Sequence, residues 1–153
     1  AEQRIYINGT LAASRVQAGA IAVNANALTL GDQPGYNEYS GGSVDEIRIW
    51  NMARTQTQIQ ENMNREIDPT SQTGLVSYYN FNTGIASGSN EGMLTVYDQA
   101  GGNNGTLQNF NLSGASSNFI AQHISLNTLP VQWLSFNAQI RDSEVLLNWS
   151  TAS

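Results

Sequence analysis

The feature that most constrains the fold is a stretch in which a strand pattern gives way at once to a helix pattern. Residues 45–50 predict a β-strand with Ile47 and Ile49 on one face and Glu46 and Arg48 on the other, because charged and apolar side chains alternate over residues 46–49. Val44 falls out of that alternation. We therefore expect a β-bulge or a bend where two glycines lead into the strand.

A short helix is expected directly after this strand. Thr55 is followed three residues later by Gln58, which is the spacing of a capping box, so Thr55 is the expected N-cap. Apolar residues then recur at every fourth position, as they do on one face of a helix: Ile59, Met63 and Ile67. The Asp68-Pro69 pair is expected to end the helix, because the residue before a proline disfavours helical geometry.

The order of strand, Trp-Asn corner and capped helix resembles the closing segment of a laminin G-like domain, within the concanavalin A-like jelly-roll superfamily. Members often read Gly-x-Ile-Asp-Glu-Val-Arg-Ile-Tyr/Trp-Asn-x-Ala-Arg-Ser/Thr-x-x-Glu-Ile, and residues 42–59 follow that pattern nearly throughout. The resemblance implies an all-β fold, namely a two-sheet antiparallel jelly-roll sandwich with one short α-helix.

Other parts of the chain add strand signals. Residues 4–11 predict a hairpin whose type I′ turn is made by Asn8 and Gly9. Further strands are expected at residues 21–30, 74–81, 94–97 and 118–124, with a turn cluster at 31–35. These strands and the helix together fit a β-sandwich.

The C-terminal segment carries a second pattern. After Leu129-Pro130, residues 131–140 and 145–150 alternate as two strands joined by a four-residue turn, 141–144. They resemble the opening strands of a fibronectin type III-like module, of the kind seen in cargo of the bacterial type IX secretion system. We expect residues 1–126 to be the C-terminal part of a laminin G-like domain with its tail. Residues 127–153 would then be a linker and the first strands of the next module, within a longer polypeptide.

Composition limits the classes of ligand. The net charge is −6, only 12% of residues are charged, and the six basic residues are all arginines. A chain without a basic run is a poor binder of nucleic acid, and no apolar run is long enough to insert into a membrane. The amide and hydroxyl side chains that replace charge suit neutral, hydroxyl-rich ligands such as sugars. Because cysteine is absent, disulfides, thiol chemistry and cysteine-based zinc sites are excluded.

No catalytic residues are expected. Glycoside hydrolases of this jelly roll carry Glu-x-Asp-x-x-Glu on one strand, and here only Glu66 and Asp68 match, with Ser71 in the last position. Pro69 also interrupts the strand that such a set requires. His123 is the single histidine, and no Gly-x-Ser-x-Gly motif accompanies it.

One loop is a candidate calcium site. Asp98, Asn103 and Asn104 lie among three glycines, and calcium prefers carboxylate, amide and carbonyl oxygens in such loops. Laminin G-like domains often bind calcium at the rim of the sandwich. The alternative is a glycine-asparagine turn that forms without an ion. The loop at residues 32–37 is a second, weaker candidate.

Tyr36 and Tyr39 are the expected ligand-binding residues. Both lie in a glycine-flanked loop, where an exposed ring can stack on the apolar face of a pyranose. For Trp50, Phe81 and Tyr97, packing inside the sandwich is the favoured alternative.

The resemblance and the composition together predict a non-catalytic extracellular module for adhesion or carbohydrate binding, in a large secreted or cell-surface bacterial protein. Its expected partners are a glycan or a surface protein, and neighbouring domains of the same polypeptide. Two alternatives remain. One is a purely architectural or assembly module, and the other is an accessory domain of a glycoside hydrolase whose catalytic domain lies outside these residues.

Overall fold

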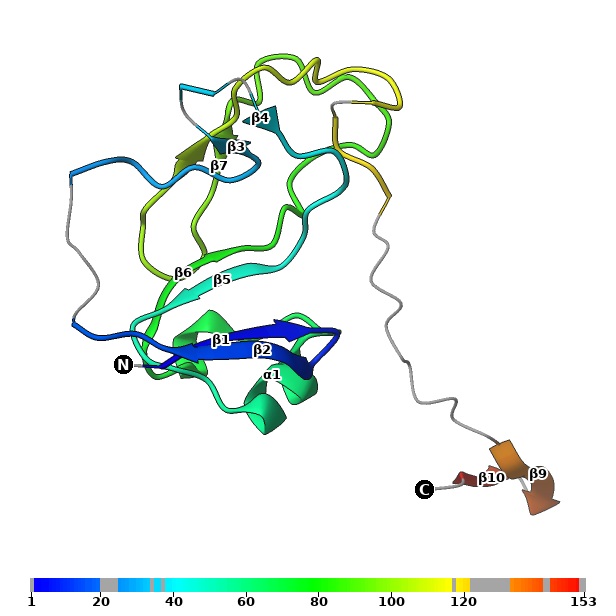
Figure 1. Ribbon diagram of the computed structural model, residues 1–153. Coiled ribbons are helices and arrows are strands. Elements are labelled where there is room, and N and C mark those ends of the chain that lie inside the picture. The colour runs from blue at the N-terminus through cyan, green and yellow to red at the C-terminus, as the bar shows by residue number, and fades with distance from the viewer. Residues whose placement is uncertain are drawn as a thin grey trace. The chain divides into compact units, whose positions relative to one another are not determined.

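A computed structural model of the chain describes residues 2–19, 25–33, 35–36, 38–116, 118–121, 133–141 and 144–151. Most of its regular elements are antiparallel strands, accompanied by one α-helix and one 3₁₀ helix (Figure 1). The expected all-β class with a single short α-helix is confirmed, and it is consistent with a concanavalin A-like fold. Within the described residues the strands pair as five two-stranded ladders. The chain divides into two compact units, Ala1–His123 and Ile124–Ser153.

The predicted N-terminal hairpin is confirmed. β1 (Glu2–Ile7) pairs antiparallel with β2 (Thr10–Val16), with one shift of register between Ile5 and Tyr6. Asn8 and Gly9 form the turn, and both have positive φ angles, 51° and 72°, as a type I′ turn requires.

The strand predicted before the Trp-Asn corner is also present. β5 (Ile47–Trp50) pairs antiparallel with β6 (Leu75–Tyr79), so two segments far apart in sequence form one ladder. The strand begins two residues later than the alternation suggested, because Glu46 has a φ of 53°. The bend therefore lies at Glu46, immediately before the strand.

The helix begins where its capping box predicted. α1 (Gln56–Asn62) has Thr55 as N-cap; the Thr55 hydroxyl accepts from the Gln58 backbone N–H at 3.2 Å, and the Gln58 side chain accepts from the Thr55 backbone at 3.0 Å. The predicted C-terminus was wrong, since the helix ends at Met63. Instead of ending α1, Asp68 caps a separate 3₁₀ helix, η1 (Pro69–Ser71).

A side chain from the sheet explains the early end of α1. The Arg48 guanidinium donates to the backbone carbonyl of Asn62 at 2.6 Å and to that of Arg65. These carbonyls take a side-chain donor instead of the N–H groups of a continued helix. Ile67 is buried after the chain has left the helix.

Two predicted strands are wrong where the structure describes them. Residues 25–30 form no strand, and Leu28 and Leu30 are exposed; residues 20–24 lie outside the described part. Residues 118–121 form no strand either, because the Asn118 side chain holds this segment to loops, donating to the carbonyls of Gly88 and Gly114. Residues 122–124 are not described.

The strand expected at residues 94–97 is present as a two-residue strand, and further short strands occur where loops or turns were expected. β3 (Asp32–Gln33) pairs with β4 (Glu38–Tyr39), and β7 (Thr95–Val96) pairs with β8 (Gly105–Thr106). Among the described residues of the first unit, the buried apolar side chains are Ile67 before β6, Tyr78 and Tyr79 within β6, and Val96 and Leu112 after it. Tyr97, which was expected to pack inside, is 54% exposed.

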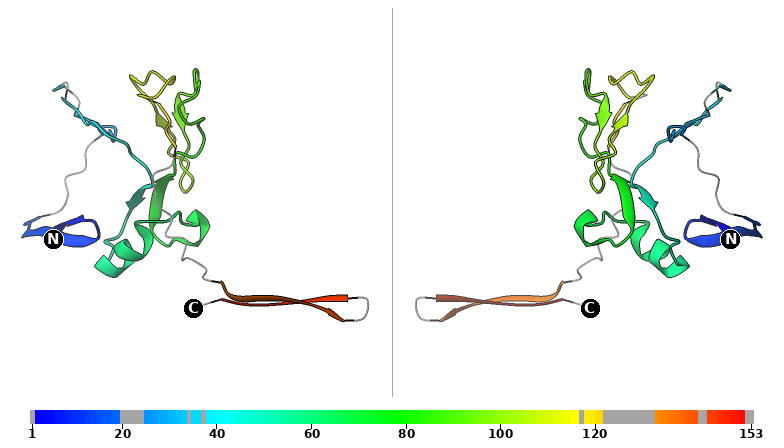
Figure 2. Two further views of the ribbon diagram at one scale, coloured as in Figure 1. Left: turned by 90° about the vertical axis from the view of Figure 1, so that its right-hand side faces the viewer. Right: turned by 90° about the vertical axis from the view of Figure 1, so that its left-hand side faces the viewer.

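The second unit is a single hairpin. β9 (Trp133–Arg141) pairs antiparallel with β10 (Glu144–Thr151), as predicted, and Figure 2 shows the two strands running side by side. The linker residues 127–132 and the turn residues 142 and 143 lie outside the described part. The domain boundary at 126/127 and the fibronectin type III-like character of this hairpin stay predictions.

Candidate functional site

The two predicted ligand-binding tyrosines lie on one small hairpin, β3–β4. Tyr36 is in the turn and Tyr39 is in β4, and their exposed fractions are 68% and 64%. The hairpin is closed at its base by a hydrogen bond from the Ser40 backbone N–H to the Gly31 carbonyl at 2.9 Å. Both rings are therefore available to a ligand, on a loop of defined register.

Asp32 lies directly opposite Tyr39 in this ladder. Opposite residues of an antiparallel pair project to the same face, so the carboxylate and the phenol ring are neighbours. Asp32 is exposed, and its backbone carbonyl accepts from the Thr29 hydroxyl at 3.0 Å. Sequence reasoning did not assign Asp32 to the same site as Tyr39, because their adjacency depends on the pairing register.

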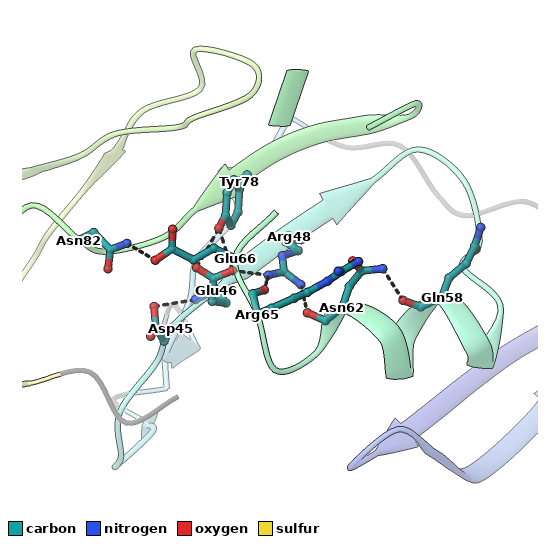
Figure 3. A network of polar contacts seen from close by, with 9 residues as sticks. All are labelled: Asp45, Glu46, Arg48, Gln58, Asn62, Arg65, Glu66, Tyr78 and Asn82. Carbon is teal, nitrogen blue, oxygen red and sulfur yellow. Dashed lines mark hydrogen bonds and ion pairs between the residues drawn. The ribbon is translucent and has the colours of Figure 1, made fainter. Parts of the chain in front are cut away.

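A second cluster of polar side chains lies between the β5–β6 ladder and α1 (Figure 3). Glu46 and Arg48 form an ion pair whose side chains are only 6% and 10% exposed. The Tyr78 hydroxyl donates to the Glu46 carboxylate at 2.7 Å, and the Arg48 guanidinium lies 5.4 Å from the centre of the Tyr78 ring.

Burial dominates the electrostatics of this cluster. Burial raises the pKa of the Glu46 carboxyl, although the hydrogen bonds from Tyr78 and Arg48 act in the opposite direction. Burial, together with the neighbouring Glu46 carboxylate, raises the pKa of Tyr78 to about 12. Among the described residues no acceptor reaches the buried Nε of Arg48. The cluster connects β5 to the end of α1, and its polar groups bond mainly to one another.

The predicted calcium loop is held together by its own hydrogen bonds. The Asp98 carboxylate accepts from the backbone N–H groups of Tyr78 at 2.8 Å, Ala100 at 2.9 Å and Asn103 at 3.0 Å. The Asn104 side-chain oxygen accepts from the Asp98 backbone N–H at 3.0 Å. The structure thus brings the three predicted ligands, Asp98, Asn103 and Asn104, into one loop.

This loop also covers the outer edge of β6. The Tyr78 N–H is taken by the Asp98 carboxylate, and the Tyr78 carbonyl accepts from the Gln99 N–H at 2.8 Å. In this way a turn and a side chain satisfy the groups that a neighbouring strand would otherwise pair.

The charge on Asp98 is strongly stabilised. Partial burial acts to raise its pKa, but the backbone N–H groups around the carboxylate outweigh that effect and bring the pKa to about 2. Because these donors point at the carboxylate, a cation would have to compete with them for the same oxygens. No cluster of three or more acidic or histidine side chains occurs in the described part of the chain. The observed geometry gives Asp98 a structural role, and calcium binding stays a prediction.

The residues that partly match a hydrolase motif also have structural contacts. Glu66 accepts from the Asn82 amide at 2.7 Å, and Asp68 accepts from the Thr70 N–H at 2.9 Å and the Thr70 hydroxyl at 2.7 Å. Asp68 thus lies at the start of a 3₁₀ helix and not in a strand. His123 is outside the described residues. The absence of catalysis stays a prediction.

Comparison with known families gives one match. Residues 1–60 match a laminin G-type family model described as the concanavalin A-like lectin/glucanases superfamily. That segment includes both the strand-to-helix pattern of residues 42–59 and the β3–β4 hairpin with Tyr36 and Tyr39. No curated protein matches the chain, and no solved structure does.

The superfamily similarity fits a module of the carbohydrate-binding or adhesion type. Within the described residues, no helix has the length and apolar character needed to cross a bilayer.

Proposed function

We propose that this chain is a non-catalytic extracellular module for carbohydrate binding or adhesion. The observation that carries the proposal is the exposure of Tyr36 and Tyr39 on one hairpin, within the segment that matches a lectin and glucanase superfamily. The partner is a glycan, free or attached to a surface protein.

The two exposed rings and the low charge content of the chain both suit a sugar ligand. Phenol rings offer apolar faces on which pyranose rings stack, while the hydroxyl group tolerates water at the rim. Large exposed apolar side chains gathered at one place commonly mark a binding surface. The low charge content of the chain suits a ligand that is recognised by stacking and hydrogen bonds.

The wider context is part of the same proposal. In the C-terminal hairpin, the register pairs residues of apolar type: Val145 with Ile140, Leu147 with Ala138, and Trp149 with Phe136. Such a pattern is typical of a strand pair with one face in a core. It supports the proposal that a fibronectin type III-like module begins here, in a secreted or cell-surface bacterial protein exported by the type IX system.

A glycan array tests the function. We expect the chain to bind at least one neutral glycan, and the double substitution Tyr36→Ala and Tyr39→Ala to abolish that binding. Tyr97→Ala is the matched control, since Tyr97 is also an exposed tyrosine but lies away from the β3–β4 hairpin in the chain, directly after β7. Retention of binding by the double variant, or no binding by the parent chain, would overturn the proposal.

A second candidate function is an architectural module that packs into an assembly. It is favoured by Ile5 and Ile7, both 60% exposed on β1. Concentration-dependent self-association in light scattering, without glycan and unaffected by the tyrosine substitutions, would support it instead.

A further inference from the structure

We infer that Asp32 binds the ligand together with Tyr39, and that this pair selects neutral sugars over acidic ones. The inference rests on the proposed function and adds a residue and a class of ligand to it. It is carried by the pairing register, by the exposure of Asp32 and by the distribution of charge along the chain.

The geometry places a carboxylate beside an aromatic ring. Residues directly opposite each other in an antiparallel pair have Cβ atoms about 4.5–5.5 Å apart. Asp32 and Tyr39 are such a pair, at the end of the ladder where the chain passes to Ser40. A sugar ring stacked on Tyr39 therefore has its edge within reach of the Asp32 carboxylate.

The Asp32 carboxylate has no hydrogen-bond donor among the described residues, since the Thr29 hydroxyl contacts the backbone carbonyl of Asp32. This distinguishes Asp32 from Asp98 and Asp68, whose carboxylates accept from backbone N–H groups. An ionised carboxylate has two acceptor oxygens and no donor, and hydroxyl-to-carboxylate hydrogen bonds are among the stronger ones. Two neighbouring sugar hydroxyls supply matching donors.

The surrounding charge disfavours an acidic sugar. No basic residue occurs between Arg15 and Arg48, whereas this stretch carries Asp32, Glu38, Asp45 and Glu46. A uronate or sulfate stacked on Tyr39 would place its charge beside Asp32 without a cation from the same stretch of chain. A neutral hexopyranose avoids this repulsion and still satisfies the carboxylate.

Affinity electrophoresis through gels that contain a polysaccharide tests the inference. The neutral probes are mannan, dextran and galactan, and the acidic probes are alginate and polygalacturonate. The variants are Asp32→Asn, which removes the charge but keeps the shape, Tyr39→Ala, and Tyr97→Ala as control. Circular dichroism verifies that each variant is folded.

We expect the parent chain to be retarded by a neutral probe and to be retarded little by the acidic ones. Asp32→Asn should bind the neutral probe about tenfold more weakly, because a charge-assisted hydrogen bond is replaced by an ordinary one. The same substitution should also reduce the difference in affinity between the neutral and the acidic probes. In the parent chain, raising the salt concentration from about 0.01 M to about 1 M should also reduce this difference in affinity. The reason is that the electrostatic screening length falls from about 30 Å to about 3 Å.

The outcomes separate the two claims. If Tyr39→Ala loses binding but Asp32→Asn behaves as the parent chain on every probe, the role of Asp32 is wrong and the proposed function stands. Stronger binding of the parent chain to alginate or polygalacturonate than to the neutral probes would also overturn the selectivity. If the parent chain binds no probe of either class, both the inference and the proposed function fail.

Discussion

At the scale of single residues, two Glu-x-Arg sequences show how burial decides the role of an ion pair. Glu2 and Arg4 form a contact whose side chains are 40% and 52% exposed. Glu46 and Arg48 have the same spacing, but they are almost completely buried and also bind a tyrosine hydroxyl and two backbone carbonyls. Solvent and salt screen the first pair, whereas the second depends on each partner being present.

Arg48→Met should lower the free energy of unfolding by about 3–5 kcal/mol, because it leaves the Glu46 carboxylate buried without its cation. Urea denaturation followed by tryptophan fluorescence measures the change. Arg4→Met is the matched control and should leave the urea midpoint nearly unchanged. Equal effects of the two substitutions would contradict the structural role of the buried pair.

Asp98→Asn should destabilise the chain in a manner that depends on pH. The pKa of Asp98 is about 2 in the folded protein, below its ordinary value of 3.8, so the ionised form favours folding. This stabilisation is complete above the ordinary pKa and disappears as the pH falls through about 2. After allowance for solvent screening, we expect a loss of about 1–2 kcal/mol at neutral pH.

Urea midpoints of the parent chain and of Asp98→Asn, measured at several pH values, give this dependence. The two curves should approach each other as the pH falls from about 4 to about 2. The same experiment with millimolar calcium tests the metal prediction, because a bound ion must raise the stability of the folded chain. A constant difference across the pH range would show that the charge of Asp98 is not the cause.

At the scale of elements, the features encoded by neighbouring residues were predictable. The Asn8-Gly9 turn and the Thr55 capping box each depend on residues within a few positions, and both are present. The strand expected at residues 21–30 relied on alternation alone, and the described residues 25–30 have no ladder partner. An alternation of side chains does not by itself predict a strand, because a strand also needs a partner strand with which to pair.

The long-range contacts of the candidate sites were harder to predict. Arg48 reaches carbonyl groups 14 and 17 positions away, and the Tyr78 hydroxyl reaches Glu46 across 32 positions. Sequence spacing contains no sign of such contacts. Tyr36 and Tyr39 were identified from their glycine-flanked loop, but the pairing of Tyr39 with Asp32 required the register of the ladder.

Thr55→Ala should lower the free energy of unfolding by about 1 kcal/mol, because the first turn of α1 loses its side-chain acceptor. Thr57→Ala is a matched control: Thr57 is exposed within the same helix, and alanine has the higher helix propensity. Thermal unfolding by circular dichroism compares the two. A loss of stability in Thr57→Ala as large as that in Thr55→Ala would argue against the capping role.

At the scale of the whole molecule, we expect the modest negative charge to oppose association between copies of the chain. The net charge is −6 at pH 7, and the isoelectric point calculated from the sequence is about 4.5. Ile5 and Ile7 are exposed apolar residues, and repulsion between like-charged copies should limit contact between them.

Light scattering should therefore rise as the pH is lowered from 7 toward the isoelectric point, and fall again when the pH is returned. A double substitution, Ile5→Thr and Ile7→Thr, should reduce the rise while leaving its pH unchanged, because it removes apolar surface without altering charge. Scattering that is flat through the isoelectric point would mean that charge does not control association.

The carboxylate at the outer side of β6 has a consequence for polymerisation. Strands with free amide groups can template the addition of further chains, and here an aspartate and a turn occupy those groups. The addition of a strand on that side is hindered by the Asp98 carboxylate at the Tyr78 N–H and by the Gln99 N–H at the Tyr78 carbonyl. Protonation of Asp98 under strongly acidic conditions would weaken only the first of these two contacts, so the protection of this strand is split between a group that titrates and one that does not.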